Sequence, residues 1–260
     1  MANYERDRTA QFGTAGRVAD GAIDEGLRAY MLGVYNYMAI GLAITGIAAL
    51  VIANLAVTND PSQAAAQFRD GVYLTSLGYA IYASPLKWVV MLAPLGAVFF
   101  LSFRINSMSV PAAQTTFWVY AAMVGISLSS IFLIYTSESV VRVFFITAAA
   151  FGGLSLYGYT TKKDLSGWGS FLIMGVIGII IAMVVNIFLQ SSALQFAISV
   201  IGVLVFAGLT AYDTQQIKEM YDVRDDGTIA GRKSIMGALR LYLDFINMFI
   251  MLLSLFGNRE

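Results

Sequence analysis

Two aspartates lie inside long apolar stretches of the sequence, where a lipid bilayer makes a carboxylate costly. Asp213 is near the end of the run SVIGVLVFAGLTAYDTQQIK, and Asp244 is about a third of the way through IMGALRLYLDFINMFIMLL. A carboxylate at the centre of a membrane span costs roughly 2.5 to 3.5 kcal/mol on insertion scales. Acidic residues in two consecutive spans therefore predict a paired site that faces the protein interior and serves a function.

The chemistry of such a pair follows from its surroundings. Two carboxylates close together in a poorly solvated site cannot both ionise cheaply, so we expect them to share a proton and titrate as a pair. When both are ionised they repel each other and offer oxygens to a hard cation such as calcium, which takes about six to eight ligands. Asp213 and Asp244 alone therefore predict a weak calcium site, which suits permeation better than storage.

The composition is that of a membrane protein. The chain has 260 residues, of which 58% are hydrophobic and 12% are charged, whereas a soluble domain carries about 25% charged residues. It contains no cysteine and no histidine, which excludes disulfides, thiolate metal sites, the Ser-His-Asp triad and the H-E-x-x-H zinc motif. Any pH sensing must therefore come from carboxyl groups. The formal net charge is zero, so nothing indicates a nucleic-acid partner.

Seven segments are long and apolar enough to span a bilayer, which requires about 20 residues each. They are predicted at residues 29–57, 86–104, 111–135, 140–159, 169–189, 193–217 and 235–255. The sequence therefore predicts an all-α membrane protein with seven transmembrane helices. Its parts are a polar N-terminal tail at 1–28, a transmembrane domain at 29–257 and a short C-terminal tail at 258–260.

The distribution of basic residues predicts the orientation. With the N-terminus in the cytoplasm, eleven of the 16 Lys and Arg residues fall in inner segments and four in outer ones, as the positive-inside rule requires. The first 28 residues mix both charges and lack an apolar core and a cleavage site, so we interpret them as a mobile cytoplasmic tail and not a signal peptide.

The two aspartates are predicted at similar depths. Asp213 lies four or five residues from the inner end of its span and Asp244 about nine from the same side, which at 1.5 Å per residue gives roughly 7 and 13 Å. Arg104, at the inner end of the second span, is a candidate gate that would compete with the cation.

Further polar residues are predicted to face the pathway. Arg240, Asp244, Asn247 and Ser254 share one face of the last span, and Asn186 adds a polar group in the middle of the fifth. Such faces should point into the bundle or a wet cavity and away from lipid.

Each candidate residue also has a structural interpretation. Asp244 would form an ion pair with Arg240 one turn away, Asp213 would lie at the headgroup level, and Arg104 would be an interfacial anchor that snorkels to the membrane surface.

Three segments resemble the Bax inhibitor-1 family of membrane proteins, and the chain resembles a bacterial member. The segments are FAGLTAYDTQQIKEMYD (206–222), LYGYTTKKDLSGWG (156–169) and ALRLYLDFINMF (238–249). The resemblance covers all seven predicted spans. It implies a seven-helix fold with the last helix at the centre of the bundle, in the bacterial inner membrane.

The resemblance also implies a function. Members of this family are pH-sensitive calcium leak channels governed by two aspartates, which fall by motif position on Asp213 and Asp244. The family's gating arginine in the second helix falls on Arg104, the only arginine there. The inner loop at 219–234 looks long for the family. Calcium is then the permeant ion, and no cofactor and no enzymatic activity are expected.

Two other functions remain open. Tyr212-Asp213 is similar to the first motif of intramembrane aspartyl proteases, but residues 241–244 read Leu-Tyr-Leu-Asp, where that class has a Gly-x-Gly-Asp turn, and no Pro-Ala-Leu stretch follows. The other is an interaction protein that restrains a membrane protease or a stress-survival partner, as bacterial relatives are thought to do, with the tail at 1–28 as the handle.

Overall fold

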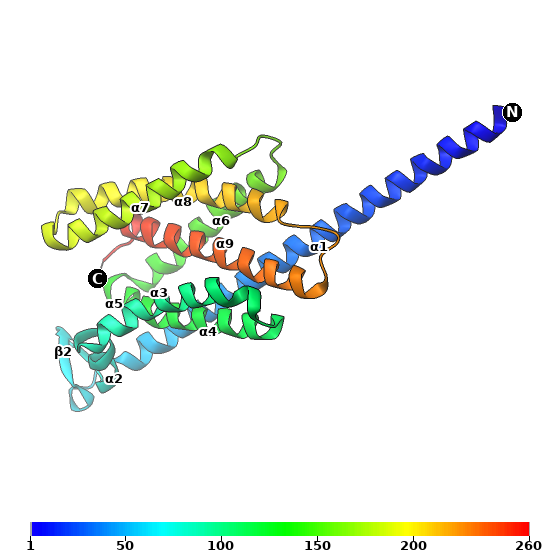
Figure 1. Cartoon of the computed structure of the whole chain (residues 1–260). Helices are drawn as coiled ribbons and strands as arrows, with labels where there is room; N and C mark the ends of the chain where they lie inside the picture. Colours follow the sequence, from blue (N-terminus) through cyan, green and yellow to red (C-terminus); the bar gives the residue numbers. More distant parts are fainter. Residues whose placement is uncertain (1, 260) are drawn as a thin grey trace.

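The protein is an all-α membrane protein with a helical bundle and one small sheet, as a computed structural model shows (Figure 1). The structure describes the backbone of residues 2–259 and the side chains of residues 25–259. Within the latter range, seven helices are long and apolar enough to cross a membrane. The predicted fold class is therefore confirmed.

The helices follow one another with short connections. They are α1 (Ala2–Ala56), α2 (Ser76–Gly78), α3 (Leu86–Arg104), α4 (Val110–Leu128), α5 (Ile131–Ile134), α6 (Ser137–Thr160), α7 (Ser166–Leu189), α8 (Ser192–Glu219) and α9 (Gly227–Phe256), with short turns η1 (Pro61–Gln63), η2 (Tyr79–Ala83) and η3 (Ile105–Ser107). Within the described chain, α3 has the predicted bounds, and α6, α7 and α8 differ from the predicted ones by at most three residues at either end.

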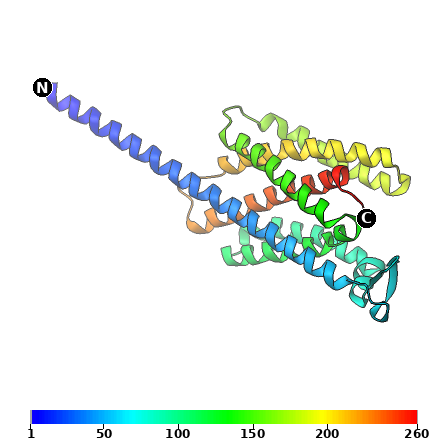
Figure 2. The same cartoon turned by 180° about the vertical axis from the view of Figure 1, so that it is seen from behind.

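The first helix begins earlier than predicted. α1 runs without a break from Ala2 to Ala56, so the segment at 1–28, which the sequence predicts as a mobile tail, continues the helix from Ala2 and projects beyond the bundle (Figure 2). Met1 lies outside the described residues, as does Glu260 of the predicted C-terminal tail.

Two further boundaries differ from the prediction. The third span breaks into α4 and α5 at Ser129, whose hydroxyl donates to the Ile126 carbonyl oxygen at 2.6 Å, and such bonds bend or end helices. α9 begins at Gly227 because the Asp226 carboxylate accepts hydrogen bonds from the first backbone amides of the helix. The loop predicted at 219–234 is therefore reduced to 220–226.

The segment between α1 and α3, residues 57–85, is folded. It holds β1 (Val57–Thr58), β2 (Ala66–Arg69) and β3 (Val72–Leu74), antiparallel in the order β1-β3-β2. The turn between β2 and β3 places Gly71 at φ 74°, a conformation that favours glycine. The sequence analysis did not predict this sheet.

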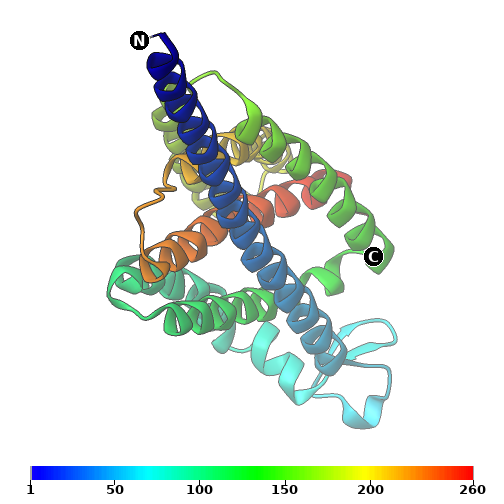
Figure 3. The ribbon, with the colours of Figure 1, turned by 90° about the vertical axis from the view of Figure 1, so that its right-hand side faces the viewer.

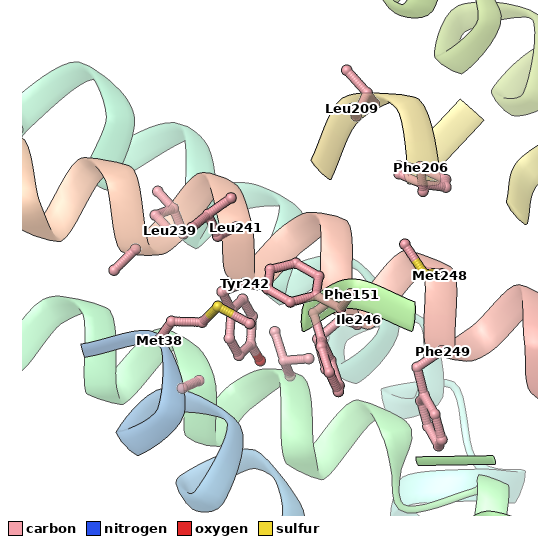
Figure 4. Close-up of a cluster of buried hydrophobic side chains, with 14 of the residues drawn as sticks. Met38, Phe151, Phe206, Leu209, Leu239, Leu241, Tyr242, Ile246, Met248 and Phe249 are labelled. Carbon is pink, nitrogen blue, oxygen red and sulfur yellow. The ribbon is translucent and has the colours of Figure 1, made fainter. Parts of the chain in front are cut away.

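α9 lies at the centre of the bundle, as predicted. It packs against α1, α4, α6 and α8, and Figure 4 shows Met38 of α1 and Phe151 of α6 beside Tyr242 of α9. Tyr242 is fully buried, and its hydroxyl lies 2.6 Å from Thr45 Oγ1. Thr45 in turn donates to the Ala121 carbonyl oxygen at 2.8 Å, so these two side chains link α9, α1 and α4.

Removing the Tyr242 hydroxyl will weaken this link. Because Thr45 keeps its bond to Ala121, Tyr242→Phe loses one buried hydrogen bond, and we expect the free energy of unfolding to fall by about 0.5 to 1.5 kcal/mol. Thermal unfolding of the purified protein in detergent measures this loss. Tyr157→Phe is the control, since Tyr157 is 48% exposed. Equal melting temperatures for the two variants would contradict the assignment.

Candidate carboxylate site

Two glycines determine how closely α8 and α9 pack. A Cβ on Gly202 of α8 would lie 2.8 Å from Met251 Cγ, and a Cβ on Gly237 of α9 would lie 2.9 Å from Ile217 Cγ2. Both distances are shorter than a van der Waals contact of about 3.5 to 4.0 Å, so the helices approach closely only because these side chains are absent. The two contacts define an antiparallel register in which Asp213 faces the α9 turn that carries Asp244.

The structure brings the two aspartates together. The side chains of Asp213 and Asp244 face each other and lie close enough to share a hydrogen bond. An ionised carboxylate has no donor, so this contact requires one proton shared by the pair. Asp244 is only 4% exposed, and Asp213 is half-buried.

The remaining environment of Asp244 is poor in donors. Apart from the facing carboxyl group, its Oδ2 is buried without a hydrogen-bond partner among the described residues. A buried carboxylate that lacks donors is costly in its charged form. The surroundings of the two carboxyl groups therefore favour a pair that holds a proton over a pair of ionised carboxylates.

Arg240 is the positive charge that acts on the pair. Its charge interacts with Asp213, Asp244 and Tyr30 of α1, but its side chain is exposed. Among the residues with described side chains, the ion pairs do not include one between Arg240 and Asp244. The simple structural ion pair considered for Asp244 is thus not the observed arrangement.

Comparison with known proteins identifies the family. Residues 27–260 match the family described as inhibitor of apoptosis-promoting Bax1. The chain belongs to the Bax inhibitor-1 family. It is 45% identical over 237 residues to a protein of Rickettsia prowazekii, which covers 91% of this chain and 92% of the relative.

Two other bacterial proteins are equally similar to this chain. A protein of Caulobacter vibrioides is 46% identical over 244 residues, 93% of this chain and 94% of its own. The inner membrane protein YbhL of Escherichia coli is 45% identical over 238 residues, 90% of this chain and 94% of its own. The resemblance inferred from the three motifs is confirmed.

Arg104, which the Bax inhibitor-1 resemblance implies as a gate, is not brought to the pair. It ends α3, which packs against α4, and its side chain is exposed. Its charge is not among the groups that act on either carboxyl. The position fits the interfacial anchor that the sequence also allows.

The other polar residues predicted to face the pathway have local partners. Asn247 donates to the Leu243 carbonyl oxygen at 2.8 Å, one turn back in α9. Asn186, which is predicted in the middle of its span, lies instead in the last turn of α7. There its Oδ1 accepts from the Ser191 amide at 3.0 Å and its Nδ2 donates to Gln195 at 3.3 Å. It therefore stabilises the turn into α8 at the opposite end of the bundle from the 220–226 loop.

One buried polar feature escaped sequence reasoning. The hydroxyls of Tyr35 (α1), Ser155 (α6) and Thr214 (α8) form a chain with contacts of 2.7 and 2.9 Å. Ser155 and Thr214 are both buried. The chain ties three helices together directly beside Asp213. Of these residues only Thr214 lies in a Bax inhibitor-1 motif, the one at 206–222, whereas Ser155 directly precedes the motif at 156–169.

A glycine makes this contact between α6 and α8 geometrically feasible. A Cβ on Gly158 would lie 2.2 Å from the Ala211 carbonyl oxygen, a backbone atom of α8. No side chain fits there without moving one of the helices. Gly158 and Ala211 therefore determine the height at which α8 presents Asp213 and Thr214 to the rest of the bundle.

Proposed function

We propose that the protein is a pH-sensitive calcium leak channel in which the Asp213–Asp244 pair is the sensor and a weak cation site. The observation that supports this proposal most strongly is the closeness of the two carboxyl groups in the bundle interior, where Asp244 is buried and its Oδ2 has no hydrogen-bond partner among the described residues. A shared proton holds the carboxyls together, and its loss leaves two like charges that repel each other and attract a hard cation. The protonation state of the pair would then decide whether α8 and α9 separate.

Three carboxylates of the connecting loops are poor candidates for the same role. Hydrogen bonds from the Arg224 side chain and backbone lower the pKa of Asp222 to about 2. Backbone hydrogen bonds from Ser62 and Ser166 lower the pKa values of Asp60 and Asp164 as well. These three groups stay ionised at neutral pH, and the chain has no histidine. The buried pair is therefore a better candidate than these three groups for a sensor that works near neutrality.

The proposal includes a location and a role. By analogy with the inner membrane protein YbhL, the chain would lie in the bacterial inner membrane, and the basic bias of its 220–226 end would place that end and the N-terminus in the cytoplasm. Calcium would be the permeant ion and not a bound cofactor, and the protein would not be an enzyme.

The proposal is tested by calcium flux into vesicles that contain the purified protein. We expect the flux to rise as the pH is raised from about 5 to about 8, a range above the titration of ordinary carboxyl groups. Vesicles without protein, and vesicles with an unrelated seven-helix protein, control for lipid leakage. A flux that is absent, or constant over this range, would contradict the proposed function.

Arg240 should determine the pH at which the leak opens. A nearby cation favours the ionised pair, so Arg240→Gln should move the half-maximal flux to higher pH, by about one unit if the charge contributes about 1.4 kcal/mol. The same flux assay over a pH series measures this shift. Arg104→Gln is the matched control, and we expect no shift because the charge of Arg104 is not among those that act on the pair. A shift with Arg104→Gln alone would instead support the gate that the family resemblance implies.

A further inference from the structure

A seam runs along the outside of the bundle between α1 and α6. Both helices pack on neighbours in the core, but they diverge from each other on either side of α9 (Figure 3). The hydrogen bond between Tyr35 and Ser155, at 2.7 Å, joins them near one end. Beyond it, Phe245 and Phe249 of α9 line the space between the two helices.

Two open hollows follow each other along this seam. The first, of about 630 Å³, lies between α1 and α6 at the 220–226 end and is lined by residues that include Arg28, Gly152 and Tyr159. The second hollow, of about 530 Å³, continues toward the opposite end of the bundle, and its lining includes Phe245 and Phe249 of α9. The second hollow is lined by apolar side chains, apart from Thr45. In a bilayer, lipid chains are the apolar material available to fill such a space.

The first hollow has a positive charge at its rim. Arg28 is exposed and forms no ion pair with any residue whose side chain is described. Across the hollow, the Lys218 ammonium donates to the Tyr159 carbonyl oxygen at 2.8 Å and lies 5.4 Å from the Tyr159 ring centroid. An aromatic ring and basic groups at the end of a span are typical of the headgroup level. The rim therefore complements a negative charge.

We propose that the seam binds one anionic phospholipid, with its phosphate at Arg28 and an acyl chain along the two hollows toward Phe245 and Phe249. The bound lipid would pack against Phe245 and Phe249 of α9, on the turns that follow Asp244. This binding site does not depend on the calcium leak, because it rests on the shape and charge of the α1–α6 seam.

The size of the hollows favours a lipid chain over a transmembrane helix of a partner protein. One turn of helix with its side chains is a cylinder about 10 Å wide and about 5.4 Å high, roughly 400 Å³. A hollow of about 530 Å³ has room for little more than one turn of helix, whereas a spanning helix of about 20 residues has more than five turns. A flexible acyl chain fills a narrow seam without this limit.

Adjacent glycines in α6 provide a matched test. Gly152 lines the first hollow, and a Cβ there meets no atom within 4 Å; the same is true of Gly153, which lies one residue, or about 100° of helix rotation, away. Gly152→Phe should fill the hollow without disturbing the bundle, and Gly153→Phe should leave the hollow open. Gly46→Phe fills the second hollow in the same way, since Gly46 also lines it and faces open space.

The probe is phosphatidylglycerol, and phosphatidylethanolamine is the comparison lipid. Each lipid is added to the full chain in detergent. Native mass spectrometry then counts the lipid molecules that remain bound to the intact protein. We expect one retained phosphatidylglycerol, and a reduction of roughly tenfold in Gly152→Phe and Gly46→Phe, where a side chain overfills the space. Gly153→Phe should bind as the unaltered protein does. Arg28→Gln should lower the preference for phosphatidylglycerol over phosphatidylethanolamine by about fivefold, the effect of one basic residue near an anionic surface.

Several results would overturn the proposal. Equal retention in Gly152→Phe and Gly153→Phe, or an unchanged lipid preference in Arg28→Gln, would show that the seam is not the binding site. A single-span protein retained in place of lipid, and lost from Gly152→Phe, would assign the seam to a helix. Melting temperatures of all four variants show whether each remains folded, and Arg28→Gln tests the headgroup contact without filling either hollow. None of these results depends on calcium flux.

Discussion

Vesicles that carry the Asp213→Asn, Asp244→Asn double variant will show at least a roughly tenfold lower calcium flux at pH 8 than vesicles with the unaltered protein, and their flux will not change with pH. Two carboxylates about 4 Å apart repel each other by about 4 kcal/mol at an effective dielectric constant of 20. That repulsion is large enough to move a closed state to an open one. Two neutral amides cannot generate it, so the variant should stay closed.

The single variants test whether both carboxyl groups are needed for the pH dependence. In Asp244→Asn, the amide can donate to the Asp213 carboxylate and hold the contact closed without a shared proton. Asp213→Asn leaves the buried Asp244 with an amide donor in the same way. Each single variant should therefore lose most of the pH dependence.

A loop carboxylate provides the control for the pair. Asp222→Asn removes a group whose pKa is about 2 and should leave the flux profile unchanged. A double variant that keeps the flux and its pH dependence would show that the aspartate pair is not the sensor, even if the protein does conduct calcium.

Gly158→Ala will destabilise the protein, although alanine is the better helix former. The added Cβ would lie 2.2 Å from the Ala211 carbonyl oxygen. Because that atom belongs to the backbone of α8, it cannot rotate away, and one helix must shift. Overpacking of this kind costs about 1 to 3 kcal/mol, and the backbone contact places this site at the upper end of that range. Thermal unfolding in detergent measures the loss.

Gly153 in the same helix provides the opposite result. A Cβ there meets no atom within 4 Å, so Gly153→Ala should leave the stability unchanged or raise it by up to about 1 kcal/mol through helix propensity. The two substitutions are identical in chemistry and differ only in what the methyl group meets. If both variants melted at the same temperature, the close approach of α6 and α8 would not exist in the folded protein.

Gly158→Ala should also affect the leak. A shift of α8 against α6 would move Asp213 and the Thr214 hydroxyl, which lies 2.9 Å from Ser155. We therefore expect a changed pH profile in this variant, and an unchanged one in Gly153→Ala.

Hydrophobicity along the sequence was sufficient to predict the seven spans. The central position of the last helix was implied by the family motifs. The bounds of α3 agree at both ends, because a bilayer requires a minimum length of apolar residues regardless of what surrounds them. The predicted start of the last span was wrong, and the break after α4 was not predicted. Both depend on hydrogen bonds of single side chains, Asp226 and Ser129.

The sequence by itself determined that this is a seven-helix membrane protein of a recognisable family, with two acidic residues that must avoid lipid. Only the tertiary structure decided that the charge acting on them belongs to Arg240 and not to Arg104, and that Asn186 lies at the far end of the bundle. The physical reason is that span length and polarity are properties of each segment alone. Which side chains meet depends on helix rotation and register, and in this protein those are set by close contacts at Gly158, Gly202 and Gly237.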